Sequence, residues 1–134
     1  MKLDPRQFSQ EAYGALESLS QQLNKKYHKK ASALVQGLPA YISTWGLHRL
    51  SGDAKSFSGK NSEDTKYKGT VYYHFLESLQ KFSGADFQPR DEKSLIFNTE
   101  MPLRDYLALN HLALRFAKEW SFWAASLLGE AENN

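Results

Sequence analysis

The residues whose type and spacing most directly indicate a binding function are four lysines within a run of six residues. The run reads Lys25-Lys26-Tyr27-His28-Lys29-Lys30. On a helix, positions i, i+1, i+4 and i+5 share one side, so the four ammonium groups would form one cationic ridge. Such a ridge can follow a phosphate backbone, and its binding would weaken as the salt concentration rises. A solvated helix face is the alternative that charge alone leaves open.

Positive charge is concentrated around this run. Residues 25–68 carry nine Lys and Arg against three Asp and Glu, whereas residues 69–134 carry six against nine. This asymmetry indicates an anionic partner. Membrane binding is disfavoured, because it needs exposed bulky apolar residues opposite the lysines, and the core requires that face.

Patterns typical of catalysis or metal binding are missing from the sequence. The chain has no cysteine, which excludes disulfides, thiolate metal sites and cysteine nucleophiles. The four histidines lie far apart, no glycine-rich phosphate loop occurs, and no serine is coupled to a base. We therefore expect no catalytic residue, no metal and no cofactor, and we interpret His74 and His111 as packing residues.

Apolar residues recur every three or four positions, which predicts helices throughout. One helix follows the Asp4-Pro5 start signal, and Gly14 inside it could mark a close helix contact. A second spans about 25–50, with a break near Gly37 because of Pro39. A third covers about 67–82, a short turn lies at 94–98, and the last runs from Leu103 to Leu128 with more than one apolar face. These signals predict an all-α fold, a compact bundle of about five helices without a sheet.

The remaining segments suggest one domain over residues 1–134. Loops are expected at about 51–65 and 84–93, which are rich in Ser, Gly, Asp and Lys or contain Gly and Pro, and a disordered tail at 130–134. The N-terminus is polar, and no apolar run approaches the roughly 18 residues that span a membrane. We expect a soluble, cytoplasmic protein.

Two segments resemble a known family. Gly37-Leu38-Pro39-Ala40-Tyr41-Ile42-Ser43-Thr44-Trp45-Gly46-Leu47 is similar to the "Leu-Pro, apolar residues, Gly-Leu" helix of the small subunit of the type III-B CRISPR (Cmr) effector complex. The helix Tyr106–Trp120 resembles that family's last helix. The resemblance extends from about Lys25 to Leu128. Within the first motif we interpret Leu38, Ile42, Trp45 and Leu47 as core residues, and Gly46 as a site of close helix packing.

The resemblance implies a non-catalytic subunit that stacks along an RNA-guided complex in antiviral defence. Its expected partners are guide RNA and target RNA, the backbone and large subunits, and copies of itself. Its basic surface would bind the RNA, which places the candidate RNA-binding set at Lys25, Lys26, Lys29, Lys30, Arg49 and Lys55. After Trp120 the family continues with basic residues, whereas this chain has Ser121-Phe122-Trp123, so Phe122 and Trp123 are expected to pack against the core or a neighbouring subunit.

Two other functions remain open. The chain could be a helical protein–protein adaptor with no nucleic-acid role, using aromatic residues of its last helix. An uncharacterised helical enzyme is disfavoured, because no nucleophile, base or metal ligands are paired in the sequence. A relative in the type III-A complex would have the same class of role.

Overall fold

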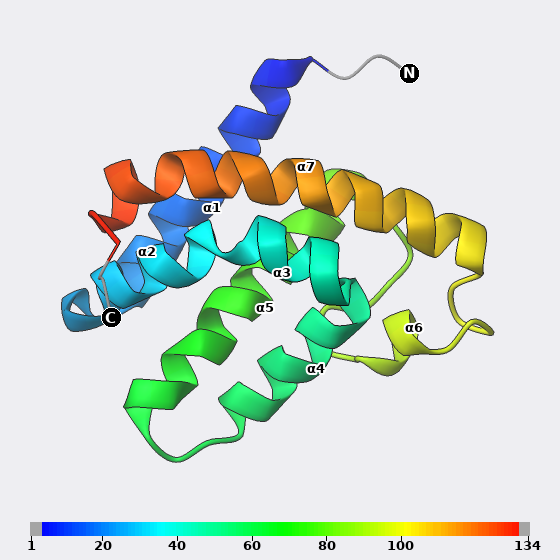
Figure 1. The fold of residues 1–134 in the computed structure, drawn as a ribbon, viewed down its shortest axis with the longest axis horizontal. Coiled ribbons are helices and arrows are strands. Elements are labelled where there is room, and N and C mark those ends of the chain that lie inside the picture. The colour runs from blue at the N-terminus through cyan, green and yellow to red at the C-terminus, as the bar shows by residue number, and fades with distance from the viewer. Residues whose placement is uncertain (1–3, 132–134) are drawn as a thin grey trace.

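Helices account for all the regular secondary structure in residues 4–131, the part of the chain that the computed structural model describes (Figure 1). In chain order the elements are α1 (Pro5–Gln22), the 3-10 turn η1 (Lys25–Tyr27), α2 (His28–Gln36), α3 (Leu38–Trp45), α4 (Leu47–Ser58), α5 (Glu63–Ser83), α6 (Lys93–Ile96) and α7 (Leu103–Leu128). The predicted all-α class without a sheet is confirmed over these residues. Of the predicted tail at 130–134, residues 132–134 lie outside the described part.

The predicted number of about five helices is too low, because the segment treated as one kinked helix contains three. Pro39 occupies the start of α3, where its missing amide hydrogen costs little, and α2 ends just before it at Gln36. Gly46 then ends α3 with φ +84°, a conformation that side chains with a Cβ rarely adopt, and α4 leaves in a new direction. The Pro39 break is therefore confirmed, and the second break at Gly46 is an addition.

The predicted loop at 51–65 is wrong over its first half. Helix α4 continues to Ser58, and Ser62 caps α5 by accepting a hydrogen bond from the Asp64 amide at 3.3 Å. Leu50, Ser51 and Ala54 are buried on the face of α4 that packs against α5. Tertiary packing therefore keeps α4 helical despite its Gly and Ser content. The stretch from Gly84 to Glu92 contains no helix or strand.

Helix α7 is the longest element and crosses the molecule along its long axis (Figure 1). It packs against α1, α2 and α3, while α4 and α5 lie side by side as a hairpin on the other side of α2 and α3. Aromatic rings fill the centre. Phe75 meets Trp120 edge-on at 5.1 Å between centroids, and Phe82 stacks on Phe116 at 5.1 Å. This arrangement leaves the two ends of α7 and the corners of the helical chain α2–α3–α4 at the surface.

Candidate nucleic-acid interface

The four predicted lysines lie together at the junction of α1 and α2. Lys25 and Lys26 belong to η1, Lys29 and Lys30 lie in the first turn of α2, and all four are exposed. Asn24 shapes the junction, since its side-chain oxygen accepts a hydrogen bond from the Lys26 amide at 3.1 Å. The cationic ridge is thus formed by a 3-10 turn and the start of a helix, and not by one continuous helix.

Tyr27 anchors this junction to α5. Its buried ring stacks on Tyr67 at 5.0 Å between centroids, and its hydroxyl donates a hydrogen bond to Asp64 Oδ1 at 2.9 Å. Because Tyr27 points inward, the lysines on either side of it point outward. The aromatic residue within the lysine run therefore holds the ridge in place.

The ridge keeps its charge available to a partner. None of the four lysines forms an ion pair with a carboxylate among residues 4–131; the Lys26 ammonium lies 5.0 Å from the centre of the Tyr27 ring. Lys29 and Lys30 also stand at the positive end of the α2 dipole, where cations are unfavourable by a few tenths to about 1 kcal/mol each. Helix stability does not explain cations at this position.

Arg49 lies at a different corner, in the first turn of α4. Its guanidinium carbon is 4.6 Å from the centre of the Trp45 ring, and both side chains are exposed. The prediction that Trp45 belongs to the core is wrong. The helical spacing from Leu38 and Ile42 places it on the buried face, but α3 ends at Trp45 and Leu47 fills the core after the turn at Gly46. The predictions for Leu38, Ile42 and Leu47 are confirmed.

Lys55 is occupied by an acidic partner. Its Nζ lies 2.8 Å from Glu92 Oε1, just before α6. The hydrogen bond from Lys55 lowers the pKa of Glu92, and the same bond raises the pKa of Lys55. An RNA phosphate would have to compete with Glu92 for this ammonium. Lys55 remains a candidate, but with less free charge than the other five residues.

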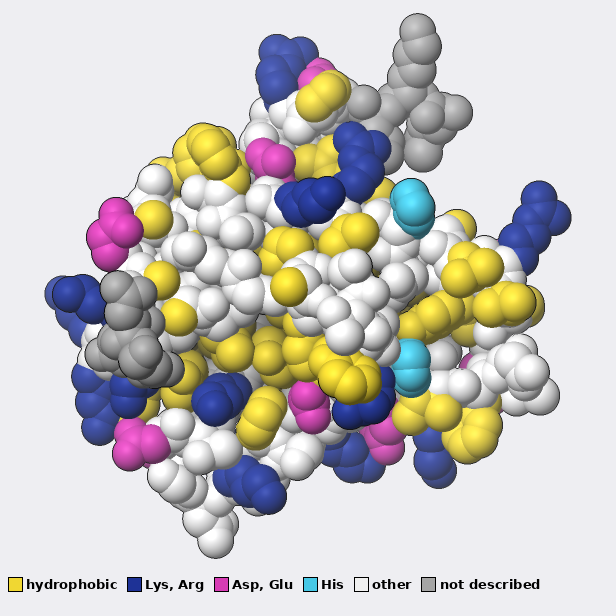
Figure 2. All heavy atoms as spheres, viewed as in Figure 1, with side chains coloured by type: hydrophobic (Ala, Val, Ile, Leu, Met, Phe, Trp, Pro, Cys, Tyr) yellow, Lys and Arg dark blue, Asp and Glu magenta, His cyan; other side chains and the backbone are white. Residues whose placement is uncertain are grey.

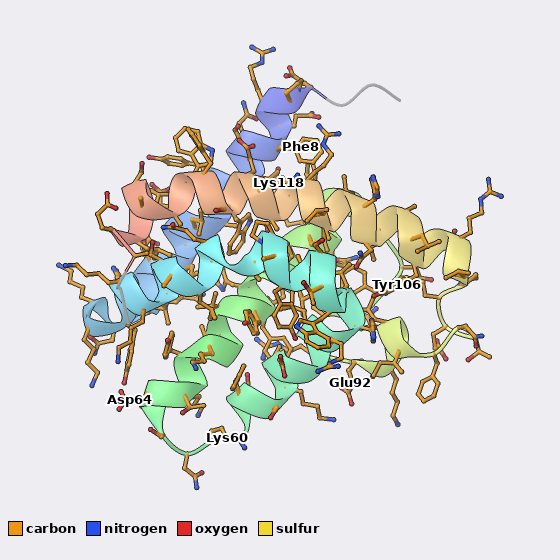
Figure 3. All side chains as sticks on the ribbon, in the orientation of Figure 1. Phe8, Lys60, Asp64, Glu92, Tyr106 and Lys118 are labelled. Atoms are coloured by element: carbon orange, nitrogen blue, oxygen red, sulfur yellow. The ribbon has the colours of Figure 1, made fainter. Side chains whose placement is uncertain are left out.

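The candidate set therefore divides into three places. Helices α2 and α3 separate the lysine ridge from Arg49, which corresponds to at most about 25 Å of helix. Figure 2 shows Lys and Arg side chains along the left and lower rim of one face, over α2, α4 and the start of α5. Lys60 and Asp64 lie near the tip of the α4–α5 hairpin (Figure 3). A strand running along α2 and α3 could contact both the ridge and Arg49.

The corner between α3 and α4 is fixed by α7, which the sequence did not reveal. Tyr106 and Asn110 lie one turn apart on α7. Asn110 Oδ1 accepts a hydrogen bond from the Leu47 amide at 2.9 Å, and the Tyr106 hydroxyl contacts His48 Nδ1 at 2.7 Å. Gly46 cannot cap α4 with a side chain, so α7 satisfies the first amide of that helix. The four-residue spacing of Tyr106 and Asn110 is the only sequence signal for this contact.

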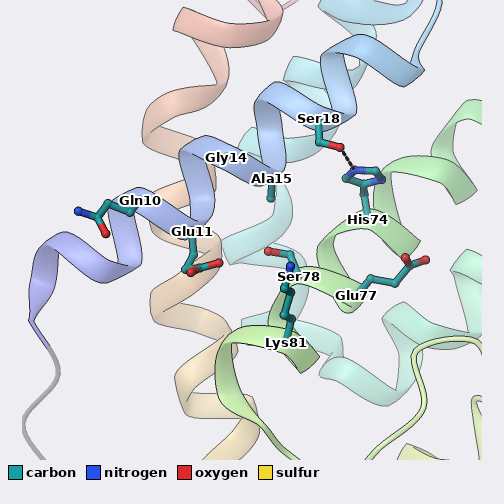
Figure 4. A pocket seen from close by; sticks show the side chains of 9 residues that line it. All are labelled: Gln10, Glu11, Gly14, Ala15, Ser18, His74, Glu77, Ser78 and Lys81. Atoms are coloured by element: carbon teal, nitrogen blue, oxygen red, sulfur yellow. Dashed lines mark hydrogen bonds between the residues drawn. The ribbon is translucent and has the colours of Figure 1, made fainter.

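A second region with titratable groups is a cleft of about 340 Å³ between α1 and α5 (Figure 4). Gln10, Glu11, Gly14, Ala15 and Ser18 of α1 line one side, and His74, Glu77, Ser78 and Lys81 of α5 line the other. His74 Nε2 and Ser18 Oγ are 3.4 Å apart, at the long limit of a hydrogen bond. Burial lowers the pKa of His74, as expected for a packing residue, although it is only partly buried.

Several expectations about individual residues change. Gly14 faces open space, so the predicted close contact at this glycine is wrong. His111 is exposed on α7 and does not pack in the core. Trp123 packs partly against the core and lies 5.5 Å from the Tyr13 ring, whereas Phe122 is 70% exposed. Of these two aromatic residues, only Trp123 packs against the core, and contact of Phe122 with a neighbouring subunit stays a prediction.

Residues 4–131 contain neither a potential metal-binding cluster nor a helix that could span a membrane. In that range no three His, Cys, Asp or Glu side chains are grouped so that they could hold a metal ion. No helix there is both long enough and apolar enough to cross a bilayer.

Comparison with known proteins identifies the family. Residues 5–121 of the 134 match the family model described as "CRISPR-associated protein (Cas_Cmr5)". Searches of curated proteins and of solved structures gave no match. The matched range contains the lysine ridge, the α3–α4 corner and most of α7. This chain therefore belongs to the Cmr5 family of type III-B CRISPR effector subunits.

Proposed function

We propose that this protein is a non-catalytic small subunit that stacks along a type III-B CRISPR complex and binds the backbone of guide and target RNA in antiviral defence. The observation that carries the proposal is the ridge of Lys25, Lys26, Lys29 and Lys30, exposed and unpaired with any carboxylate in the described part of the chain. A compact row of ammonium groups suits phosphates, which repeat along a strand regardless of its sequence. Binding is accordingly expected without sequence preference.

Charge reversal tests this role. Replacing Lys26, Lys29 and Arg49 by Glu should weaken binding of the purified protein to single-stranded RNA, measured by fluorescence anisotropy across a salt series. Each phosphate contact contributes about −0.7 to the slope of log affinity against log salt for a single strand, so losing three should reduce that slope by about 2. Binding and salt slope equal to those of the wild type would contradict the proposal.

The matched control makes the same change in charge elsewhere. Lys81, Lys93 and Lys118 are exposed and lie outside the candidate set. Their triple replacement by Glu should reduce affinity much less, because only long-range attraction changes. Thermal unfolding of both variants checks the fold; since Lys29 opposes the α2 dipole, the first variant should not be less stable than the control.

Contacts with neighbouring copies are supported by exposed apolar residues at the two ends of α7. At one end, a pocket of about 340 Å³ is lined by His48, Leu95, Ile96, Asn98, Met101, Leu103 and Tyr106. At the other end Phe122 projects from the helix, 70% exposed. In Figure 2, apolar side chains gather at the right end of the face, over α6 and the start of α7. An apolar knob and an apolar pocket on opposite ends suit head-to-tail association of identical chains.

The adaptor role without RNA is favoured by the same apolar residues. Assembling the complex with the charge-reversed subunit, and measuring its affinity for target RNA, separates the two functions. If the charge-reversed subunit enters the complex normally and the complex still binds target RNA with wild-type affinity and salt dependence, the adaptor function is correct. Loss of RNA affinity with normal assembly supports RNA binding.

A further inference from the structure

An exposed tryptophan at a rigid corner calls for an explanation beyond the phosphate contacts already proposed. Trp45 is 50% exposed, although an indole ring gains most from burial. It also lies outside the residues that line the apolar pocket between α6 and α7. Its only aromatic or cationic neighbour recorded among the described residues is the Arg49 guanidinium.

Arg49 places a positive charge directly on this exposed ring. The guanidinium lies over the indole at 4.6 Å, and Arg49 forms no ion pair with a carboxylate in residues 4–131. Asp53, one turn further along α4, accepts a hydrogen bond from the Tyr41 hydroxyl at 2.5 Å. A guanidinium stacked on a ring keeps N–H groups at its edge free for a phosphate. The pair thus offers the exposed part of an aromatic surface together with an unneutralised cation on the same corner.

The corner that carries the pair is held firmly. The turn at Gly46, with φ +84°, lies between Trp45 and Arg49, and a Cβ at Gly46 would lie 2.6 Å from the Tyr106 hydroxyl, so the backbone here lies close against α7. Asn110 fixes the Leu47 amide. Ligands bind a preformed surface with a smaller loss of conformational entropy.

We propose that Trp45 and Arg49 form a platform for one unpaired nucleobase of the bound RNA. The base stacks on the exposed indole surface, and Arg49 binds an adjoining phosphate. A base inside a duplex has both faces covered, so only an unpaired base can use this platform. The inference rests on the proposed function, because the same strand would have to lie along α2 and α3 between this corner and the lysine ridge.

A double comparison tests the platform with the full-length protein. Short single-stranded RNA is compared with an RNA of equal length and equal phosphate number that lacks its bases. Trp45→Ala should bind the normal RNA at least about fivefold more weakly than the wild type does, whereas its affinity for the abasic RNA should be unchanged. Trp45→Phe should recover most of the loss, since a phenyl ring still stacks. Arg49→Ala should weaken binding to both RNAs, because both carry phosphates.

Controls separate the platform from folding and from the wider proposal. Trp45 is exposed, so the melting temperature of Trp45→Ala should match that of Trp45→Phe within a few degrees. Equal affinity of wild type and Trp45→Ala for the normal RNA would overturn the platform, and the lysine variants would still report on phosphate binding. A wild-type protein that binds neither RNA would overturn the proposed function and the platform together. If Trp45→Ala binds RNA normally but fails to enter the complex, Trp45 contacts a protein, and the platform is likewise overturned.

Discussion

At the scale of single residues, aromatic hydroxyls and imidazoles connect segments that are distant in sequence. Tyr27 joins η1 to α5, and Tyr106 joins α7 to α4. Burial raises the pKa of Tyr72 to about 12, and burial also lowers the pKa of both His48 and His74. These groups remain neutral at ordinary pH, so they serve as hydrogen-bonding and packing residues and not as charges.

The two histidines predict how stability depends on pH. A histidine whose pKa is lower in the folded state binds a proton more readily when the protein is unfolded. Acid therefore favours the unfolded state, and the free energy of unfolding should decrease as pH falls below about 6.5. It should level off once pH passes below the folded pKa values. Urea denaturation from about pH 8 to about pH 5 measures this, and the double variant His48→Gln, His74→Gln should show a flatter profile.

The same variant provides the internal reference. Above about pH 7.5 the imidazoles of His48 and His74 are largely neutral in both states, so any difference from the wild type there reflects lost contacts such as the His48–Tyr106 hydrogen bond. Only the part of the difference in the free energy of unfolding that changes with pH reflects protonation of His48 and His74. A difference between the two proteins that stays constant across the pH range would show that neither pKa is lowered by folding.

At the scale of elements, two mid-helix glycines have opposite roles. Gly69 lies where α5 approaches α4, and a Cβ there would be 2.7 Å from the Ser58 backbone nitrogen and closer still to the Ser58 hydroxyl. Gly14 has nothing within 4 Å of the corresponding position. Replacing glycine by alanine stabilises a helix by about 1 kcal/mol if space allows. Gly14→Ala should therefore stabilise the protein by about 0.5–1 kcal/mol.

Gly69→Ala should have the opposite effect. The added methyl group meets backbone atoms, which cannot rotate away, so α4 and α5 must separate at a cost of about 1–3 kcal/mol that exceeds the gain in helix propensity. Chemical denaturation of both variants measures whether each substitution raises or lowers the free energy of unfolding. If Gly69→Ala were as stable as Gly14→Ala, α4 and α5 would not be in the close contact described.

These elements also show what a single sequence could predict. The Asp4-Pro5 start, the break at Pro39 and the buried face containing Leu38 and Ile42 follow from local chemistry and periodicity, and they were predicted correctly. The extension of α4 to Ser58, the exposure of Trp45 and the close approach at Gly69 depend on which helix packs on which. Periodicity places a residue on the apolar face of its helix, but it does not show how far along that face a neighbouring helix packs.

At the scale of the whole molecule, the proposed apolar contacts predict a specific mode of assembly. If Phe122 of one copy enters the pocket beside Leu103 of the next, Phe122→Ser and Leu103→Glu should each prevent self-association. An equal mixture of the two variants should form dimers and nothing larger, because each retains one intact partner surface. Sedimentation velocity at increasing concentration measures this.

The mixture distinguishes head-to-tail from two-fold contact. In a symmetric dimer each copy uses the same patch, so mixing two variants that each disrupt that patch restores nothing. Gln21→Glu, a change at an exposed position outside both proposed contacts, serves as the control and should associate like the wild type. Growth of the mixture beyond dimers would show that at least one of Phe122 and Leu103 is not required for the contact.

The capping of α4 by α7 affects the order in which parts of the chain fold during synthesis. The first helical amide of α4 depends on Asn110, which the ribosome adds more than 60 residues later. Until that part of the chain has emerged, the start of α4 lacks its partner, and the Gly46 turn has no Tyr106 to rest against. The corner bearing Trp45 and Arg49 would then be completed late in synthesis. If this corner binds RNA as proposed, a nascent chain would gain full RNA affinity only after Asn110 has emerged, which would limit binding by incomplete copies.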